Sequence, residues 1–349
     1  MRTHVILTDN SPISTVVVGR GMDEHIARSL SAKPGRQAAL LCQPTTTDIA
    51  RSVAATLATA GIETVTKVLP DGEEAKRLTV VEDVYRLLNS KRFSRDDAVV
   101  GIGGGALTDV AGFIAATYLR GISAVYVPTT LLAAVDAAIG GKTAVNVDGK
   151  NLAGVFAHPE AVLIDMDIID ALPRDQQILG AAEAVKTGFI ADLAIVSAFE
   201  AGGMDTDLED VVNRSVAVKV RVVNEDFTEQ GTRAILNYGH TIGHGIESTT
   251  GMPHGASVAV GMVAAGYASE HAVGFTGALR QEEILANIGL PVRAPGANLA
   301  DVRAMMALDK KRDSSGLRMV LLEDFGSPVI IHPDDATVRA AFAGIDLIE

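Results

Sequence analysis

The N-terminal half of the chain alternates short apolar runs with segments of helical periodicity. The apolar runs are rich in β-branched residues and lie at 15–18, 37–42, 63–69, 98–102, 123–127 and 161–164. Stretches such as 47–60 and 80–88 instead repeat their apolar positions every three to four residues. Strands that alternate with helices are typical of a mostly parallel sheet covered by helices on both faces. We therefore expect an α/β domain here.

The pattern changes near residue 174, after Leu172-Pro173. Alanine-rich segments of helical periodicity follow one another at 181–198, 208–223, 235–248 and 257–272. No strand pattern returns until 318–322 and 328–331, which together predict a small hairpin. We expect an α/β domain over residues 1–174 and a mainly α-helical domain over residues 175–349.

Composition places the chain among globular proteins. It has 349 residues, of which 48% are hydrophobic, and its mean hydropathy is +0.25, so it can build full cores. No apolar run reaches the roughly 18 residues that a membrane span needs, and the N-terminus lacks the apolar region of a signal peptide. The single cysteine, Cys42, stands in an apolar run, which predicts a buried thiol. These features predict a cytoplasmic protein.

Charge excludes several classes of partner. The net charge is -13, which opposes binding to nucleic acid or to anionic membranes, since both require a basic surface. Tryptophan is absent and aromatic residues make up 4% of the chain, which argues against a base-stacking surface. Any anion that this protein binds must therefore meet a local cluster of cations.

Three of the eight histidines fall within one short segment of the second domain. His240 and His244 stand four residues apart, so on a helix both imidazoles project from one face. His254 follows a Gly-Met-Pro turn that can return it to the same place. Because imidazole is a frequent ligand of Zn²⁺, this segment indicates a metal site. Two core-facing histidines and one loop histidine would give the same pattern.

A glycine-rich turn, Gly101-Ile-Gly-Gly-Gly-Ala106, follows one predicted strand and opens a helix. Backbone N–H groups at such a turn can face a bound phosphate, although glycines there also serve packing alone. In the Rossmann fingerprint the next strand would end in a ribose-binding acid, yet here it ends in Pro128-Thr129-Thr130. We therefore do not expect a standard Rossmann half.

A second glycine motif, Gly140-Gly-Lys-Thr143, resembles the end of a P-loop. Asp136 stands where the first glycine of that loop is required, so NTP hydrolysis of the Walker type is disfavoured. Polar and cationic residues surround the motif, and taken singly each could be an ordinary solvated side chain: Arg120, Asp136, Lys142, Lys150 and Asn151.

Further motifs follow these in one order over most of the chain. They are Asp71-Gly-Glu-Glu-Ala-Lys76, Gly103-Gly-Gly105 with Asp109, Ala115 to Gly121, Pro128 to Leu132, Val135-Asp-Ala137, Gly140 to Thr143, Gly149-Lys-Asn151, Ala182-Glu-Ala-Val-Lys186, Lys219 with Asp226 and Glu229, Arg233 to His244, His254-Gly255 and Asp309-Lys-Lys311. This series resembles the 3-dehydroquinate synthase family of sugar phosphate cyclases.

The resemblance implies an NAD-binding α/β domain, a helical metal- and substrate-binding domain, and a site in the cleft between them. That site would hold one divalent metal, usually Zn²⁺, with Co²⁺ as a possible substitute. The implied ligands are Glu183, His240 and His254, a set that agrees with the three-ligand chemistry of catalytic zinc. By the same resemblance, His244 becomes a second imidazole beside the reacting groups and not a ligand.

The resemblance also distributes roles among the remaining residues. Those that would line NAD are Asp71, Gly72, Glu73, Lys76, Gly103, Gly104, Gly105, Asp109, Thr129, Thr130, Lys142 and Lys150. Those with catalytic roles would be Lys142, Lys186, Arg233, Asn237 and His244. Those that would bind substrate are Arg120, Asp136, Lys150, Asn151, Lys219 and one of Lys310 or Lys311.

The implied substrate is 3-deoxy-D-arabino-heptulosonate 7-phosphate, and the implied product is the carbocycle 3-dehydroquinate, in the shikimate pathway of aromatic amino acid biosynthesis. The reaction would proceed by transient oxidation with NAD⁺, β-elimination of phosphate, re-reduction and an intramolecular aldol closure. A small sugar phosphate explains why an acidic protein would keep a cationic pocket. Family habit further suggests a homodimer, with neither a nucleic-acid nor a membrane partner.

Four positions depart from the family pattern: Ala138, Ala144, Ala171 and Phe227. They leave two related enzymes as alternatives, a paralogous cyclase of secondary metabolism and a metal-dependent polyol dehydrogenase that releases NADH. A non-catalytic nucleotide- or metal-binding protein is a third alternative. Because all the charged and ligand residues are retained, the sequence favours the synthase.

Overall fold

A computed structural model describes residues 1–8, 11–30, 35–312 and 316–348; the side chains of residue 23 and of residues 308–312 also lie outside the description. The chain divides into two compact units, which are described separately. The first comprises Met1–Leu172 and Lys219–Thr228, and the second comprises Pro173–Val218 and Glu229–Glu349. Among the described residues, no helix combines the length and the apolar character required to cross a membrane.

The first unit is built on a sheet with the strand order β1-β2-β9-β6-β5-β3-β4. The strands are β1 (Arg2–Thr8), β2 (Ser11–Gly19), β3 (Gln37–Cys42), β4 (Glu63–Val68), β5 (Ala98–Gly103), β6 (Ser123–Pro128) and β9 (Ala161–Asp165). Among the described strands of this sheet, β1 and β2 form the only antiparallel pair, which confirms the expected mostly parallel sheet. The register pairs Gly103 with Pro128, so β5 and β6 end side by side.

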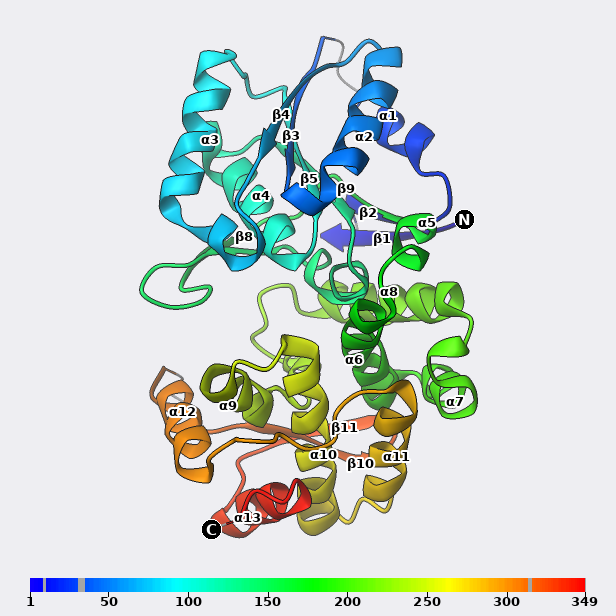
Figure 1. Cartoon of the computed structure of the whole chain (residues 1–349), viewed down its shortest axis with the longest axis vertical. Coiled ribbons are helices and arrows are strands. Elements are labelled where there is room, and N and C mark those ends of the chain that lie inside the picture. The colour runs from blue at the N-terminus through cyan, green and yellow to red at the C-terminus, as the bar shows by residue number, and fades with distance from the viewer. Residues whose placement is uncertain (9–10, 31–34, 313–315, 349) are drawn as a thin grey trace. The chain divides into compact units, whose positions relative to one another are not determined.

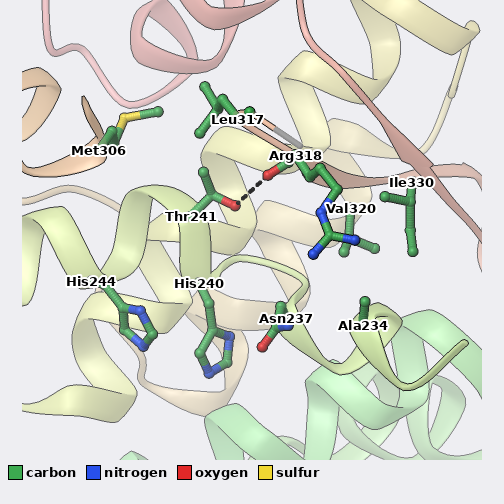
Figure 2. Close-up of a pocket in the computed structure, with 11 residues that line it drawn as sticks. Ala234, Asn237, His240, Thr241, His244, Met306, Leu317, Arg318, Val320 and Ile330 are labelled. Atoms are coloured by element: carbon green, nitrogen blue, oxygen red, sulfur yellow. Dashed lines mark hydrogen bonds between the residues drawn. The ribbon is translucent and has the colours of Figure 1, made fainter. Parts of the chain in front are cut away.

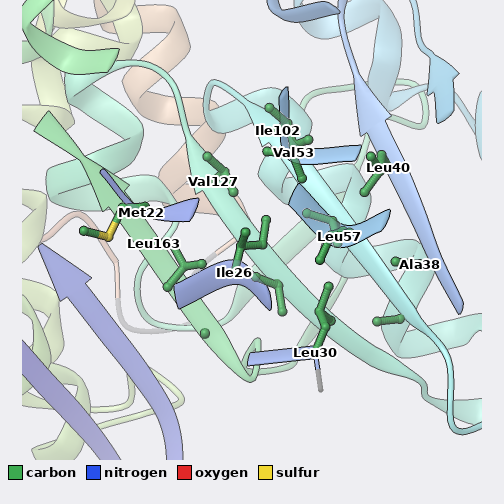
Figure 3. Close-up of a cluster of buried hydrophobic side chains, with 14 of the residues drawn as sticks. Met22, Ile26, Leu30, Ala38, Leu40, Val53, Leu57, Ile102, Val127 and Leu163 are labelled. Carbon is green, nitrogen blue, oxygen red and sulfur yellow. The ribbon is translucent and has the colours of Figure 1, made fainter. Parts of the chain in front are cut away.

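Helices cover this sheet because its strands are apolar on both faces. They are α1 (Asp23–Leu30), α2 (Thr47–Thr59), α3 (Leu78–Ser90), α4 (Gly105–Thr117) and α5 (Met166–Asp170). Figure 3 shows one layer of the core, in which Leu40 and Ile102 of the sheet lie with Ile26 of α1 and Leu57 of α2. These residues are all at most 2% exposed.

A small hairpin in the first unit was not predicted from the sequence. It pairs β7 (Lys142–Val145) with β8 (Ala153–Phe156) in antiparallel register. Asn146, at its turn, donates its backbone N–H to the carbonyl of Lys76 at 2.8 Å. The turn of the hairpin therefore lies against the 3-10 turn Gly72–Lys76.

The second unit is mainly helical, as expected (Figure 1). It contains α6 (Arg174–Ala191), α7 (Leu193–Gly202), α9 (His240–Thr250), α10 (His254–Val273), α11 (Ala278–Ile288), α12 (Leu299–Arg312), α13 (Asp335–Gly344) and most of α8 (Leu208–Glu225). The predicted hairpin is present as β10 (Met319–Asp324) and β11 (Ser327–Ile331).

Two helical boundaries differ from the sequence prediction. The segment 181–198 is two helices, because Asp192 is extended (φ -144°, ψ 98°) and its carboxylate accepts a hydrogen bond from Ala194 N to cap α7. The segment 235–248 becomes α-helical only at His240. The preceding Gly239 has φ +78°, a left-handed conformation that α-helices do not contain.

Candidate active site and metal centre

One carboxylate and two imidazoles converge in the second unit. Glu183 lies within α6, whereas His240 and His254 are the first residues of α9 and α10. One ligand atom from each lies within 4.8 Å of the others. Because the two helices begin at these histidines, short turns fix both side chains relative to the buried helix α6.

The Glu183 carboxylate is fully buried and divides its two oxygens between different partners. Oε2 accepts a hydrogen bond from the Lys186 ammonium. Oε1 lies 3.3 Å from His254 Nε2 and 3.6 Å from His240 Nε2, but it accepts no hydrogen bond of good geometry. A buried acceptor left in this state normally costs free energy, and a divalent cation between the three atoms would satisfy it. The residues therefore fit a metal site.

The Nδ1 atoms of these two histidines, on the side of each ring away from Glu183, each contact an oxygen atom. His240 Nδ1 lies 3.1 Å from the carbonyl oxygen of Tyr238, and His254 Nδ1 lies 2.9 Å from Glu247 Oε2. An Nδ1–H that donates to such an acceptor leaves Nε2 unprotonated and directed at a metal, which is the usual arrangement around metal-bound histidines. Glu247 was not identified from the sequence.

The electrostatics of the three groups differ. Burial alone would raise the pKa of Glu183, but the Lys186 ammonium and the two imidazoles outweigh it and hold that pKa well below its usual range. Burial and the nearby Lys186 lower the pKa of His240 to about 3, so this imidazole is neutral at physiological pH. Glu183 and His240 are therefore in the protonation state that a metal ligand requires. Burial acts to lower the pKa of His254, but the carboxylates of Glu183 and Glu247 outweigh it and raise that pKa to about 10, so a metal would have to displace a proton from this imidazole.

His244 lies one helical turn beyond His240, as the sequence predicted. Its ring centroid is 5.0 Å from that of His240 and 5.9 Å from that of His254. His244, Glu247 and His254 form a second group within ligand distance of one another. The first group differs in holding a buried carboxylate oxygen without a hydrogen bond, which makes it the stronger metal candidate.

A pocket of about 260 Å³ opens beside these histidines (Figure 2). Its lining combines imidazole, amide and guanidinium groups with apolar side chains: Ala234, Asn237, His240, Thr241, His244, Met306, Gly316, Leu317, Arg318, Val320 and Ile330. Arg318 enters from the side opposite to His240 and His244. The sequence reasoning missed it, although a cation that heads an otherwise apolar strand was a usable signal.

Two further predicted residues belong to the segment before His240: Asn237, which lines the pocket, and Arg233. Asn237 donates from Nδ2 to Glu229 Oε1 at 3.0 Å, which fixes the orientation of its amide. Arg233 is only 1% exposed and lies in the 3-10 turn Thr232–Asn237. The side chains of Lys310 and Lys311, predicted to bind substrate, lie outside the described residues.

In the first unit, several predicted cofactor and substrate residues come together. The buried Lys76 ammonium donates to Asp109 Oδ2 at 2.6 Å and to Asn151 Oδ1. Glu73 accepts a hydrogen bond from Asn146 Nδ2 at 2.8 Å. Burial raises the pKa of Asp109 to about 6 even though the neighbouring Lys76 acts in the opposite direction. These residues form one polar cluster where the hairpin meets the turn Gly72–Lys76.

The glycine turn stands at the start of α4. A Cβ on Gly103 would lie 2.8 Å from Leu107 Cβ, so packing alone requires glycine there. Gly104 caps the helix without a side chain, which leaves the N-terminus of α4 open to an anion. Thr129 is buried, and its N–H donates to the Gly103 carbonyl at 2.9 Å. The packing and phosphate-binding interpretations are therefore compatible.

The remaining predicted residues of the first unit are partly bonded within the fold and partly exposed. Asp136 accepts a hydrogen bond from Lys219, so this pair is brought together. Thr130 Oγ1 accepts a hydrogen bond from Ala133 N at 3.2 Å. The others are exposed: Asp71, Gly72, Arg120, Lys142 and Lys150.

Phe227, one of the four departures from the family pattern, packs against neighbouring aromatic side chains. Phe227 stacks on His158 with ring centroids 4.1 Å apart and meets Phe156 edge-on at 5.4 Å. A Cβ on Gly141 would lie 2.9 Å from Phe227 Cε2, so the ring packs directly on the second glycine motif. Phe227 thus adds apolar contact behind the β7–β8 hairpin.

Comparison with known proteins identifies the relatives of this chain. A family model described as 3-dehydroquinate synthase N-terminal matches residues 66–178, and one described as 3-dehydroquinate synthase C-terminal matches residues 180–312. The 3-dehydroquinate synthase of Corynebacterium pseudotuberculosis is 41% identical over 338 residues, which cover 94% of this chain and 94% of that protein.

Solved structures with a similar fold extend over nearly the whole chain. A 2-deoxy-scyllo-inosose synthase complexed with carbaglucose-6-phosphate, NAD⁺ and Co²⁺ has a TM-score of 0.85 at 26% identity, covering 97% of this chain and 99% of its own. A 2-epi-5-epi-valiolone synthase from Streptomyces hygroscopicus, with NAD⁺ and Zn²⁺ bound, has a TM-score of 0.84 at 24% identity, covering 97% and 98%. The second likeness concerns the fold alone.

Proposed function

Because the chain belongs to the 3-dehydroquinate synthase family, we propose that it converts 3-deoxy-D-arabino-heptulosonate 7-phosphate into 3-dehydroquinate and inorganic phosphate. Sequence identity of 41% to a 3-dehydroquinate synthase, over 94% of the chain, supports the choice of substrate. The observation that carries the chemistry is the convergence of His240 and His254 on the buried carboxylate of Glu183, beside a polar pocket.

The metal would be held by Glu183 Oε1, His240 Nε2 and His254 Nε2, with the buried Glu183 oxygen as the central support for this assignment. A bound Zn²⁺ or Co²⁺ would polarise the substrate hydroxyl that is oxidised and lower its pKa. Lys186 holds the other oxygen of Glu183 and so limits rotation of the carboxylate. His244, which lines the pocket beside His240, would exchange a proton with the bound substrate.

NAD would lie along the first unit. Its proposed contacts are Asp71, Gly72, Glu73, Lys76, Gly103, Gly104, Gly105, Asp109, Thr129, Thr130, Lys142 and Lys150. NAD supplies the hydride acceptor for the transient oxidation and returns the hydride later in the same turnover. The open N-terminus of α4 suits a pyrophosphate, and the Lys76–Asp109–Asn151 cluster holds its side chains rigidly for contact with the nucleotide.

The substrate carries a phosphate and a carboxylate, so its proposed contacts are mainly cations and amides. They are Arg120, Asp136, Lys142, Lys150, Asn151, Lys186, Lys219, Arg233, Asn237, His244 and one of Lys310 or Lys311. Two of these, Lys186 and Arg233, are almost fully buried in a protein of net charge -13. Lys186 is paired with Glu183, and cations of this kind can also donate charge-assisted hydrogen bonds to phosphate and carboxylate oxygens, which supports binding of an anionic substrate.

Two rival enzymes make different products. A cyclase that makes a different product, 2-deoxy-scyllo-inosose synthase, is less similar to this chain, at 26% identity against 41% for a 3-dehydroquinate synthase. A polyol dehydrogenase would release NADH with each turnover and would have no use for phosphate-binding cations. Product analysis separates all three.

We further propose that the protein is a cytoplasmic homodimer. The free, buried thiol of Cys42 suits a reducing compartment. Leu152 and Phe156 of the β7–β8 region are 49% and 42% exposed and offer apolar area to a second copy. Light scattering coupled to size-exclusion chromatography tests the dimer, and a monomeric mass at micromolar concentration would contradict it.

The deciding experiment incubates the protein with the heptulosonate phosphate, NAD⁺ and Zn²⁺. We expect inorganic phosphate to rise linearly while absorbance near 340 nm, the NADH band, stays flat, because the hydride is returned within each turnover. Glu183→Gln is the control and should lose metal and activity together. NADH that accumulates in proportion to turnover would favour a dehydrogenase, and activity that survives complete metal removal would refute the metal assignment.

A further inference from the structure

His240 follows a tight turn whose geometry determines where its ring nitrogens point. Tyr238 has φ -54° and ψ 128°, and Gly239 has φ +78° and ψ -18°. These values match a type II β-turn with Tyr238 and Gly239 at its centre. The peptide between the two central residues is flipped in a type II turn relative to type I. The direction of the Tyr238 carbonyl, which His240 Nδ1 approaches at 3.1 Å, therefore depends on this turn.

Gly239 fixes one side of the turn. A Cβ there would lie 2.5 Å from Met262 Cγ and 3.0 Å from the Val258 carbonyl oxygen, and the positive φ is itself unfavourable for other residues. Helix α10 thus packs directly on the backbone of the turn.

The Tyr238 side chain anchors the first central residue of the turn by a hydrogen bond to Gln281, which is distant in sequence. Its hydroxyl donates to Gln281 Oε1 at 2.7 Å, and Gln281 Nε2 donates to the Met262 carbonyl at 2.6 Å. Both side chains are 0% exposed. Gln281 belongs to α11 and lines neither cavity found beside α12, so nothing in its position suggests contact with substrate.

We propose that Gln281 and Tyr238 are positioning residues for His240. The chain of contacts runs from the Met262 carbonyl through the Gln281 amide and the Tyr238 hydroxyl to the turn, whose carbonyl holds His240 Nδ1. In this way the α10–α11 packing sets both the tautomer and the direction of Nε2. The inference rests on the proposed role of His240 as a metal ligand.

Gln281→Leu tests this, because leucine keeps similar volume but removes both hydrogen bonds. We expect Co²⁺ affinity to fall about fivefold, somewhat less than the tenfold or more that follows loss of a direct partner of a ligand histidine. The visible absorption bands of the Co²⁺ form should also change, because they report ligand geometry. Tyr238→Phe should act in the same direction.

Ser269→Ala is the matched control. Ser269 is equally buried on α10, and its hydroxyl bonds Ala265 O at 2.6 Å and Leu322 N at 3.0 Å, but no contact links it to His240. It should lose folding stability while keeping the wild-type Co²⁺ affinity and spectrum. If Gln281→Leu also loses stability without any change in Co²⁺ affinity or spectrum, its role is structural only and the proposal is wrong.

A metal-free measurement separates this inference from the metal assignment. In ¹⁵N-histidine-labelled protein, the Nδ1 proton of His240 should exchange slowly in the wild type and in Ser269→Ala, and faster in Gln281→Leu. If wild-type protein binds no Co²⁺ but this difference is present, the metal assignment fails and the positioning chain stands. Equal exchange in all three proteins would overturn the positioning chain.

Discussion

Glu247 Oε2 lies 2.9 Å from Nδ1 of His254, so a carboxylate on α9 holds the first side chain of α10. The other ring nitrogen, Nε2, is thereby directed at Glu183. A carboxylate behind a ligand histidine fixes its orientation and makes it a stronger donor. Glu247 therefore belongs to the proposed metal site although it would not touch the metal.

From this contact we expect Glu247→Gln to weaken Zn²⁺ binding by about tenfold, because the amide preserves the shape but loses the charge. Competition with a chromogenic chelator measures the affinity. Glu282→Gln is the control, since Glu282 also accepts a hydrogen bond, from Tyr267, but makes no contact with the histidines. Equal Zn²⁺ affinity in wild type and Glu247→Gln would contradict the expected role.

The buried carboxyl of Asp109 leads to a pH prediction. Its pKa rises from an ordinary 3.8 to about 6 on folding, mainly through burial, so the folded protein keeps this proton to a higher pH than the unfolded chain. The stability contributed by Asp109 is therefore greatest below about pH 4 and falls as pH rises toward 6.

We accordingly expect the free energy of unfolding of the wild type, relative to Asp109→Asn, to fall by an amount on the order of 2 kcal/mol between pH 4 and pH 7. Asparagine does not titrate, so the difference isolates Asp109 from the other acids. Urea unfolding at a series of pH values measures it. A carboxyl ¹³C titration of Asp109 with its midpoint near pH 4 would show that the site does not raise this pKa.

Much of the fold was predictable because its signals are local. The buried parallel strands appear as continuous apolar runs, and Gln37–Cys42 matches its predicted bounds. The β7–β8 hairpin escaped prediction because each strand has only four residues among glycines, so neither run is long enough to show a period. The break at Asp192 escaped because alanine-rich sequence on both sides continues the helical pattern.

In the candidate site too, residues close together in sequence were predictable, whereas residues joined only by tertiary contacts were not. His240 and His244 were recognised because four residues separate them on one helix. Glu183 was assigned through family resemblance alone, since α6 meets α9 and α10 only in the folded chain. Gln281 was missed for the same reason, because its role depends on tertiary contacts that no spacing encodes. Arg318 did carry a local signal, a cation at the head of an apolar strand, but only the folded chain places it at the pocket.

Two glycines with the same backbone conformation should respond differently to alanine. Gly239 and Gly274 have φ of +78° and +77°. A Cβ added to Gly239 would collide with Met262, whereas a Cβ added to Gly274 would have no other atom within 4 Å. Gly274→Ala should cost roughly 1 kcal/mol of stability, the strain of the left-handed conformation. Gly239→Ala should cost at least about 2 kcal/mol more, because α9 and α10 must separate. Equal costs in chemical denaturation would show that the turn is not tightly packed.

Arg318 offers a test of how the pocket recognises its anionic ligand. Its guanidinium faces the pocket from the side opposite to the histidines, and its carbonyl accepts a hydrogen bond from Thr241 at 3.3 Å, which ties its backbone to α9. A hydrogen bond to a charged group contributes roughly 1.5–3 kcal/mol. Arg318→Leu should therefore raise KM for the sugar phosphate by about tenfold or more, with Zn²⁺ affinity unchanged because no metal ligand is touched.

The matched variant is Arg303→Leu. Arg303 lies on α12 beside a neighbouring cavity of about 290 Å³, where its guanidinium stacks over Phe342 at 5.5 Å. It shares the charge and the region of Arg318 without lining the pocket at His240, so its loss should leave KM within about twofold, the range of an ordinary surface change. A similar rise in KM for both variants would indicate a general effect of charge on the acidic protein, and unchanged KM in Arg318→Leu would remove Arg318 from substrate recognition.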